Sequence, residues 1–468
     1  MPIPGSFMNF QSYQNTHRLP FIIVADMESI LPKTTTQQGK KTTITSIHKP
    51  ASVRYNIIPR EDLNLELKTY AFVGENCVID FLKSLISNCE EIQTMYKTTN
   101  IPIHSVNLDE HKKSETCYLC KGGFTQENHK VKDHDHLTGK YRGPACNTCN
   151  LKCRNDRLQI PVFFHNGKNY DFQHIINSIA TAIEDPKQKL NCIALNSEKF
   201  LTLQIKHVNI CFKDSFGFMA SSLESLVSSL KKSDPNGFKH TTKYFMNKGY
   251  NKEQIDLLIQ KGHFPYEWFD SFDKLEYIGL PPIEDFYSTL SCKGIKIEEY
   301  QHAQLVYKTF KCENFKDYHD IYLACDVFLL SDLLEYQRDL TLRIYQLDLA
   351  HYLTNPGMFW DAMLMLSKVK LELLSDIEIY EFFEKGIRGG VSMVSKRHAR
   401  EIKGENHIGY FDATNLYGVA MVRPLPTHGF KWIEDFDEQT IYNYNDDSED
   451  SYTIEVTTRI PKDKHELF

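Results

Sequence analysis

Runs of apolar residues along the chain predict short buried strands that alternate with amphipathic helices. Residues 21–25 and 160–164 are continuous apolar runs rich in β-branched and aromatic side chains, which is typical of central strands. Between 172 and 183, apolar residues recur every three or four positions, which is the spacing of a helix with one buried face. Further strands are expected within 201–218. The pattern favours an α/β (α+β) fold.

Other segments are assigned by the same reasoning. Helices are expected at 221–230, after Pro281-Pro282 and at 326–345, and a last strand at 408–411. Residues 33–45, rich in Thr, Gln and Lys, indicate an exposed loop or hairpin tip. In 326–345 the charged side chains are expected to face solvent: Asp332, Glu335, Arg338 and Asp339.

Composition and charge bear on the number of domains and on whether the protein binds a membrane or a nucleic acid. The 468 residues, 41% hydrophobic and 25% charged, allow two to four domains at ~100–200 residues each. No apolar run approaches the ~18–20 residues of a membrane helix, so we expect an intracellular protein with no membrane partner. The net charge of −7 argues weakly against nucleic acid. However, eight acids lie in 434–450, and 110–157 carries ten bases against six acids, so one segment is distinctly basic.

Carboxylates occur at the ends of predicted elements, where several of them could share a metal ion. Asp26 and Glu28 follow the first strand at a spacing of two and project from one face. Asp171 stands at the start of a helix, and Tyr322 and Asp326 share a helical face. Each residue also has a plainer interpretation. Asp26 and Glu28 could mark a solvated strand end, Tyr322 could be a core aromatic, and Asp326 could be an acid near a helix start. Taken singly, these residues identify no function.

In this order the residues resemble the three proofreading exonuclease motifs of family B DNA polymerases: Asp26/Glu28, Asn166…Asp171 and Tyr322…Asp326. The resemblance implies a 3′-5′ exonuclease domain on an RNase H-like fold, with two Mg²⁺ ions held by the four carboxylates. It also implies that Tyr322 positions the attacking water and that Asn166 contacts DNA.

The resemblance continues into the start of a polymerase palm. Residues 386–390, Gly-Ile-Arg-Gly-Gly, resemble the element that joins the exonuclease and polymerase domains. This resemblance implies DNA contacts by three residues: Arg388, Gly389 and Gly390. Residues 410–418 resemble polymerase motif A, which implies that Asp412 binds Mg²⁺ and that Tyr417 contacts the incoming nucleotide. Here Asn415 and Gly418 replace the usual Ser and Pro.

The stretch 238–288 and Pro424-Leu-Pro426 resemble the protein-primed branch of this family, found in large transposons, linear plasmids and related viruses. The resemblance implies single-stranded 3′ ends and primer-template DNA as partners, a terminal priming protein, and a nuclear location if the chain derives from a eukaryotic transposon. Neither of the later polymerase motifs, B and C, follows Asp412. We therefore expect a truncated form that keeps exonuclease motifs and DNA binding but does not polymerise by itself.

A Cys/His-rich segment interrupts the predicted exonuclease domain. Cys117-x-x-Cys120 and Cys146-x-x-Cys149 have the spacing of a tetrahedral Zn²⁺ site with four cysteine ligands. His134 or His136 could replace a cysteine as ligand, although four well-spaced thiolates make this unnecessary. Cys153 is expected to be a spare thiol.

The same segment resembles recombination endonuclease VII, a ββα-metal nuclease. The resemblance implies that Asp133 and Asn150 hold Mg²⁺ and that His134 is the general base. Alternatively, the module is structural and grips DNA through basic side chains: Lys130, Lys132, Lys140, Arg142, Lys152, Arg154 and Arg157.

The predicted domain plan is a lead-in (1–20), an exonuclease domain in two parts (21–109 and 158–345), the zinc module (110–157), a linker (346–405) and a partial palm (406–468). Three functions compete. The first is a truncated protein-primed DNA polymerase with exonuclease motifs, the second is a structure-specific DNA endonuclease acting through the zinc module, and the third is a non-catalytic, transposon-derived DNA-binding remnant.

Overall fold

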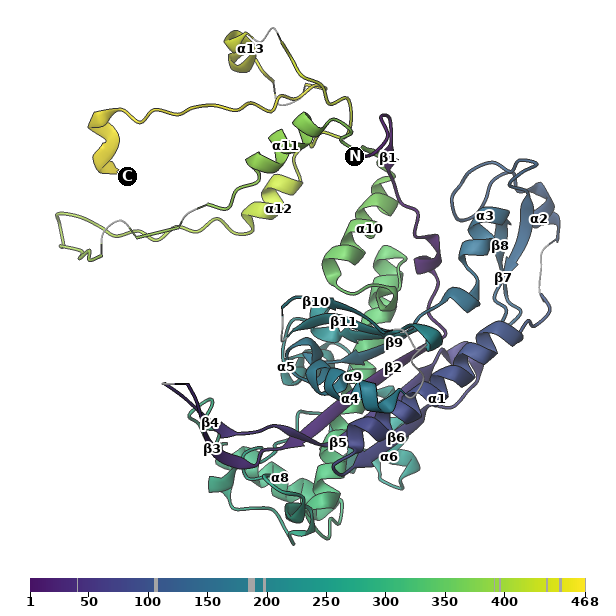
Figure 1. Cartoon of the computed structure of the whole chain (residues 1–468), viewed down its shortest axis with the longest axis vertical. Helices are drawn as coiled ribbons and strands as arrows, with labels where there is room; N and C mark the ends of the chain where they lie inside the picture. Colours follow the sequence, from purple (N-terminus) through teal and green to yellow (C-terminus); the bar gives the residue numbers. More distant parts are fainter. Residues whose placement is uncertain are drawn as a thin grey trace. The chain divides into compact units, whose positions relative to one another are not determined.

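The computed structural model describes residues 1–39, 41–104, 108–183, 190–196, 199–390, 392–394, 397–434, 437–445 and 448–467 (Figure 1). They fall into two compact units, Gln11–Ala362 and a second unit made of Met1–Phe10 with Met363–Phe468. Of the acidic stretch at 434–450, Asp435, Asp446 and Asp447 lie outside the described residues.

Among the described residues of Gln11–Ala362, seven strands form one mixed sheet in the order β10-β11-β12-β9-β2-β5-β6. Their bounds are β2 (Phe21–Ile30), β5 (Lys49–Pro59), β6 (Lys68–Val73), β9 (Ile160–Phe164), β10 (Leu190–Ala194), β11 (Phe200–Ile205) and β12 (Ile210–Asp214). The central strands β12, β9 and β2 are parallel, and the outer pairs are antiparallel. The α/β class expected from the sequence is confirmed.

Helices pack on both faces of this sheet. On one face, α1 (Cys77–Thr98) and α4 (Asp171–Ala182) bury an apolar core against alternate residues of β2 and β5. On the other face lies α9 (Phe315–Tyr345), which in turn is covered by α5 (Leu223–Ser233) and α6 (Lys239–Asn247). The long helix α9 is therefore enclosed on two sides.

Two expectations about these elements were wrong. The first strand runs to Ile30, so Asp26 and Glu28 lie within it rather than after it. The long helix begins at Phe315, where the Asn314 side chain caps it by accepting a hydrogen bond from the Asp317 N–H.

Of the four charged side chains expected to face solvent on this helix, Asp332 and Arg338 are buried, whereas Asp339 is exposed as expected. Asp332 is 2% exposed and accepts hydrogen bonds from the main chain of His240 and Thr241, while Arg338 is 1% exposed and pairs with Asp348. These side chains face neighbouring protein because α9 has no free solvent face at these positions.

Two smaller substructures extend from the sheet. The expected hairpin is confirmed as β3 (Lys33–Gln38) paired with β4 (Thr42–Ser46), which projects beyond β2 and β5 (Figure 1). The Cys/His-rich segment forms α2 (Leu108–Lys113), then β7 (Lys130–His134), β8 (Tyr141–Cys146) and α3 (Asn147–Lys152). The last three give the ββα order of the expected module.

The remaining helices are shorter: α7 (Lys252–Asp256), α8 (Ile297–Thr309) and α10 (Asn355–Ser367). In the second unit, β1 (Phe7–Met8) pairs with β13 (Leu371–Glu372), and the helices are α11 (Ile377–Gly386), α12 (Leu416–Met421) and α13 (Glu438–Tyr442).

The strand expected at 408–411 is absent from the structure. Tyr410 and Phe411 are 92% and 93% exposed, and no described residue pairs with this segment, so its apolar side chains have no surface to cover. Across the part of the chain that is described, no helix is both long enough and apolar enough to cross a membrane.

Candidate metal centres

Three carboxylates converge between the sheet and helix α9. Asp26 and Glu28 lie two residues apart on β2, so both side chains leave the same face of the sheet. Asp326 reaches them from the middle of α9. Carboxylate oxygens of the three residues lie within 4.8 Å of one another, close enough to bind one metal ion. The structure thus brings together residues that are 300 positions apart.

Asp171 stands beside this group. It is the first residue of α4, which follows the carboxyl end of β9, and it is 4% exposed. The loop before it is held by Asp214 at the end of β12, which accepts hydrogen bonds from the main-chain N–H of Asn166 (2.8 Å) and of Lys168 (3.3 Å). Asn166 has φ 67°, a left-handed conformation that Asn tolerates. Asp214 therefore positions Asn166 and Asp171.

The electrostatics of the cluster favour a bound cation. Burial and the charge of Asp326 raise the pKa of Asp26 to about 7, although Lys261 acts in the opposite direction. Burial and the charge of Asp26 also raise the pKa values of Glu28 and Asp171. Oδ1 of Asp326 is buried and has no hydrogen-bond partner among the described residues. Mg²⁺ prefers such oxygen ligands and would offset the repulsion, so these residues fit the metal implied by the sequence.

A lysine and two tyrosines complete the site. The Lys261 ammonium group forms an ion pair with Oδ2 of Asp326 and lies 5.1 Å from the centroid of the Tyr322 ring. The Tyr322 hydroxyl lies 2.7 Å from the hydroxyl of Tyr266. At Gly262, a Cβ atom would come within 2.8 Å of the Tyr322 ring, so the absence of a side chain there makes room for the ring.

Sequence reasoning missed Lys261, Gly262, Tyr266 and Asp214. The first three lie in the stretch 238–288 that resembles the protein-primed branch, but no periodicity or close spacing connects them with Asp326.

The second centre is the cysteine cluster. The Sγ atoms of four residues lie within 4.8 Å of one another: Cys117, Cys120, Cys146 and Cys149. Neither His134 nor His136 belongs to this group of described side chains, which favours four thiolates as the ligands. Cys153 is buried and does not belong to this group of described side chains.

Asp133, which the nuclease resemblance makes a Mg²⁺ ligand, is 1% exposed and bound by protein groups. Arg142 donates from Nη2 to Oδ1 (2.7 Å) and from Nε to Oδ2 (3.0 Å), and the Tyr118 hydroxyl donates to Oδ2 (2.6 Å). Arg142, expected to contact DNA, is thus turned inward to neutralise Asp133. A metal ion here would compete with a bidentate guanidinium.

The other residues of this module are placed differently. His134 ends β7, and Asn150 lies in α3, directly after Cys149. Lys140 is exposed. Asp135 accepts a hydrogen bond of 2.7 Å from Arg60, which follows β5, and this ion pair ties the module to the seven-stranded sheet.

Comparison with known families decides the identity. The family model of DNA polymerase type B, organellar and viral, matches residues 152–467, about two thirds of the chain. The chain belongs to this family. The model of recombination endonuclease VII matches residues 91–163, which confirms the expected insertion. No curated protein and no solved structure matches the chain.

The polymerase match includes the second unit, but the structure does not assemble a site there from the expected residues. All five are exposed: Arg388, Gly389, Gly390, Asp412 and Tyr417. Asn415 has φ 53° and caps α12 by accepting a hydrogen bond from Gly418 N–H (3.1 Å). A side chain at Gly418 would overlap the Asn415 amide. The two departures from motif A are therefore structurally linked.

Proposed function

We propose that this type B polymerase chain removes nucleotides from DNA 3′ ends at the carboxylate cluster. The observation that carries this proposal is the buried Oδ1 of Asp326, which lies beside Asp26 and Glu28 and has no hydrogen-bond partner among the residues that the structure describes. Two Mg²⁺ ions, held by these residues and Asp171, would supply the positive charge that activates water and stabilises the leaving 3′ oxygen.

The protein groups around the cluster have separate roles in this proposal. Lys261 compensates one oxygen of Asp326 and leaves the other for a cation. The hydroxyl pair of Tyr322 and Tyr266 orients the attacking water, because each phenol can donate one hydrogen bond and accept another. Asn166, exposed on the loop before Asp171, contacts the DNA strand.

The partners follow from the families. Type B polymerases and endonuclease VII both act on DNA, so we infer that single-stranded 3′ ends and primer-template DNA are the substrates. A terminal priming protein belongs to the same proposal, because 238–288 resembles the protein-primed branch. The exposed residues Asp412 and Tyr417 are proposed as ligands of Mg²⁺ and nucleotide in the polymerase unit.

The exonuclease is tested with the double variant Asp26→Asn/Glu28→Gln, which keeps side-chain size while removing two charges. We expect loss of Mg²⁺-dependent shortening of a 5′-labelled single strand. Unfolding temperature in EDTA should not fall, because two repelling carboxylates have been removed. Glu253→Ala/Asp256→Ala, two exposed acids of α7, is the matched control and should keep full activity. Undiminished shortening by the first variant would refute the proposal.

A second candidate function, endonuclease activity of the zinc module, has the endonuclease VII match and the ββα order in its favour. The pairing of Asp133 with Arg142 favours a structural module instead. The variant His134→Ala separates the two functions on a four-way DNA junction. Loss of internal nicking, with His129→Ala unchanged, would support cleavage by the module. If His134→Ala and His129→Ala give the same internal nicking as each other, the result would support a structural module that binds DNA.

A further inference from the structure

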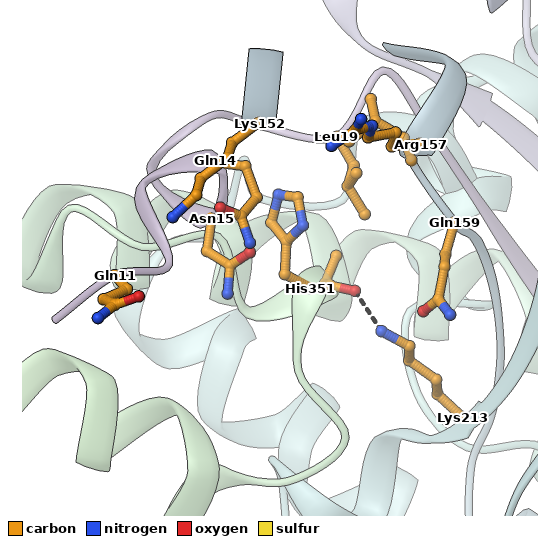
Figure 2. A pocket seen from close by; sticks show the side chains of 11 residues that line it. Gln11, Gln14, Asn15, Leu19, Lys152, Arg157, Gln159, Lys213 and His351 are labelled. Atoms are coloured by element: carbon orange, nitrogen blue, oxygen red, sulfur yellow. Dashed lines mark hydrogen bonds between the residues drawn. The ribbon is translucent and has the colours of Figure 1, made fainter. Parts of the chain in front are cut away.

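A cavity of about 400 Å³ lies beside the sheet, and none of the residues of the carboxylate cluster lines it. Leu19, just before β2, and Gln159, just before β9, line it together with Lys213 of β12. Figure 2 shows Gln14 and Lys152 on one side of the cavity and Gln159 with Lys213 on the other. Its volume is within the range of small-molecule sites.

The cavity is positively charged. Lys152, Arg157 and Lys213 line it, and its described lining contains no Asp or Glu. Lys213 is 1% exposed, and the hydrogen bond that the structure gives its ammonium group is to the main-chain oxygen of Ala350 (2.6 Å; Figure 2). In the described part of the chain, no carboxylate forms an ion pair with Lys213. A buried ammonium group without a negative partner is uncommon, because desolvation disfavours the charge.

Asp348, the acid whose charge acts on Lys213, is already paired with Arg338. Asp348 accepts two hydrogen bonds from Arg338, at Oδ1 (2.9 Å) and at Oδ2 (2.6 Å). Burial lowers the pKa of Lys213, although Cys211 and, to a smaller extent, Asp348 act in the opposite direction. An anion in the cavity would therefore supply the charge that Lys213 lacks.

Amide groups also line the cavity. Gln11, Gln14 and Asn15 lie on the side of Lys152, and Gln159 lies on the side of Lys213 (Figure 2). Oε1 of Gln14 is buried and has no hydrogen-bond partner within the described residues. An amide side chain can both donate a hydrogen bond to a nucleic-acid base and accept one from it. The cavity thus combines cations for a phosphate with amide groups for a base.

We propose that this cavity binds a nucleotide, with its phosphate at Lys213, its base at Gln14, and Lys152 and Arg157 adding positive charge around it. The nucleotide is either a free nucleoside monophosphate or one unit of a DNA strand, which present the same groups. This site is separate from the exonuclease centre and does not depend on that assignment.

The test is titration calorimetry of the full chain in EDTA with dAMP, inorganic phosphate and a short single-stranded oligonucleotide. Lys213→Met keeps the volume of the side chain and removes the buried charge, and we expect at least a tenfold loss of dAMP affinity. Lys152→Ala/Arg157→Ala changes only the rim and should weaken binding several-fold without altering the unfolding temperature. Arg154→Ala, an exposed neighbour paired with Asp156, is the control and should bind normally.

The outcomes are distinguishable. If the oligonucleotide competes with dAMP for binding, the cavity accepts one unit of a DNA strand. If the oligonucleotide leaves dAMP binding unchanged, the cavity is a site for free nucleotide. Tighter binding of dAMP than of phosphate, abolished by Gln14→Ala, would support the base contact. If wild type binds neither dAMP nor oligonucleotide, or if Lys213→Met and the rim variant both bind as tightly as wild type, the proposal is overturned.

Discussion

The ion pair between Lys261 and Asp326 gives a quantitative prediction. Asp326 is 1% exposed and the Lys261 side chain 29% exposed, so Lys261→Met leaves a buried carboxylate with one less partner. Removing one member of a fully buried pair costs ~3–5 kcal/mol. Because Lys261 is partly exposed, we expect about 2 kcal/mol for this variant in EDTA, which corresponds to an unfolding temperature lower by roughly 3 °C for a unit of this size.

A double-mutant cycle with Asp326→Asn isolates the pair. In Lys261→Met/Asp326→Asn no uncompensated carboxylate remains at Asp326, so the double variant should be less destabilised than the sum of the single variants, by ~1 kcal/mol or more. The measurement is thermal unfolding of all four proteins in EDTA. In Mg²⁺ the loss for Lys261→Met should shrink, because a cation beside Asp326 replaces the missing charge. Additivity within ~0.5 kcal/mol, together with no effect of Mg²⁺, would refute this account.

Three further predictions concern other parts of the structure. Gly262→Ala should displace the Tyr322 ring and lower exonuclease kcat about tenfold or more, with a far-UV spectrum unchanged; full activity would show that the ring tolerates the contact. Cys146→Ser should lose bound Zn²⁺ by metal analysis and make 110–157 sensitive to protease, whereas retained metal would exclude ligation by all four cysteines. Burial lowers the pKa values of His17 and His351 to about 4, so both are neutral when folded near pH 6 and protonated when unfolded. The stability that these two neutral histidines contribute is fully present above pH ~6.5 and should be lost as the pH drops towards 4. The unfolding temperature of His17→Gln should therefore fall less over this pH range than that of wild type. An equal fall in both proteins would contradict a neutral, buried His17.

The sequence predicted those elements that are marked by residues only a few positions apart. The apolar run of β9, the helical spacing of α4 and the close pairs of cysteines each depend on residues a few positions apart. The order of Asp26, Asp171 and Asp326 predicted a carboxylate site through resemblance. The structure brings Asp26 and Asp326 together, and Asp171 is near enough for the charge of Asp26 to raise its pKa.

Contacts made by tertiary packing could not be predicted in this way. Lys261 meets Asp326 across 65 positions, and nothing periodic marks it. The charged residues Asp332 and Arg338 of α9 were predicted to be solvated because a periodic pattern assumes one free face, whereas both are buried by packing against other parts of the chain. The apolar residues at 408–411 indicated a strand, but a strand also requires a neighbour, which the sequence pattern alone does not supply.

The position of the zinc module has a consequence for the order of folding during synthesis. About 90 residues separate the end of β6 from the start of β9, and β9 is the parallel neighbour of β2. At ~5–20 residues per second, the ribosome leaves one edge of β2 unpaired for several seconds or longer, and unpaired edges aggregate. The four cysteines emerge within this interval, so a cell short of zinc should yield insoluble chains even when the finished enzyme would tolerate the loss of metal.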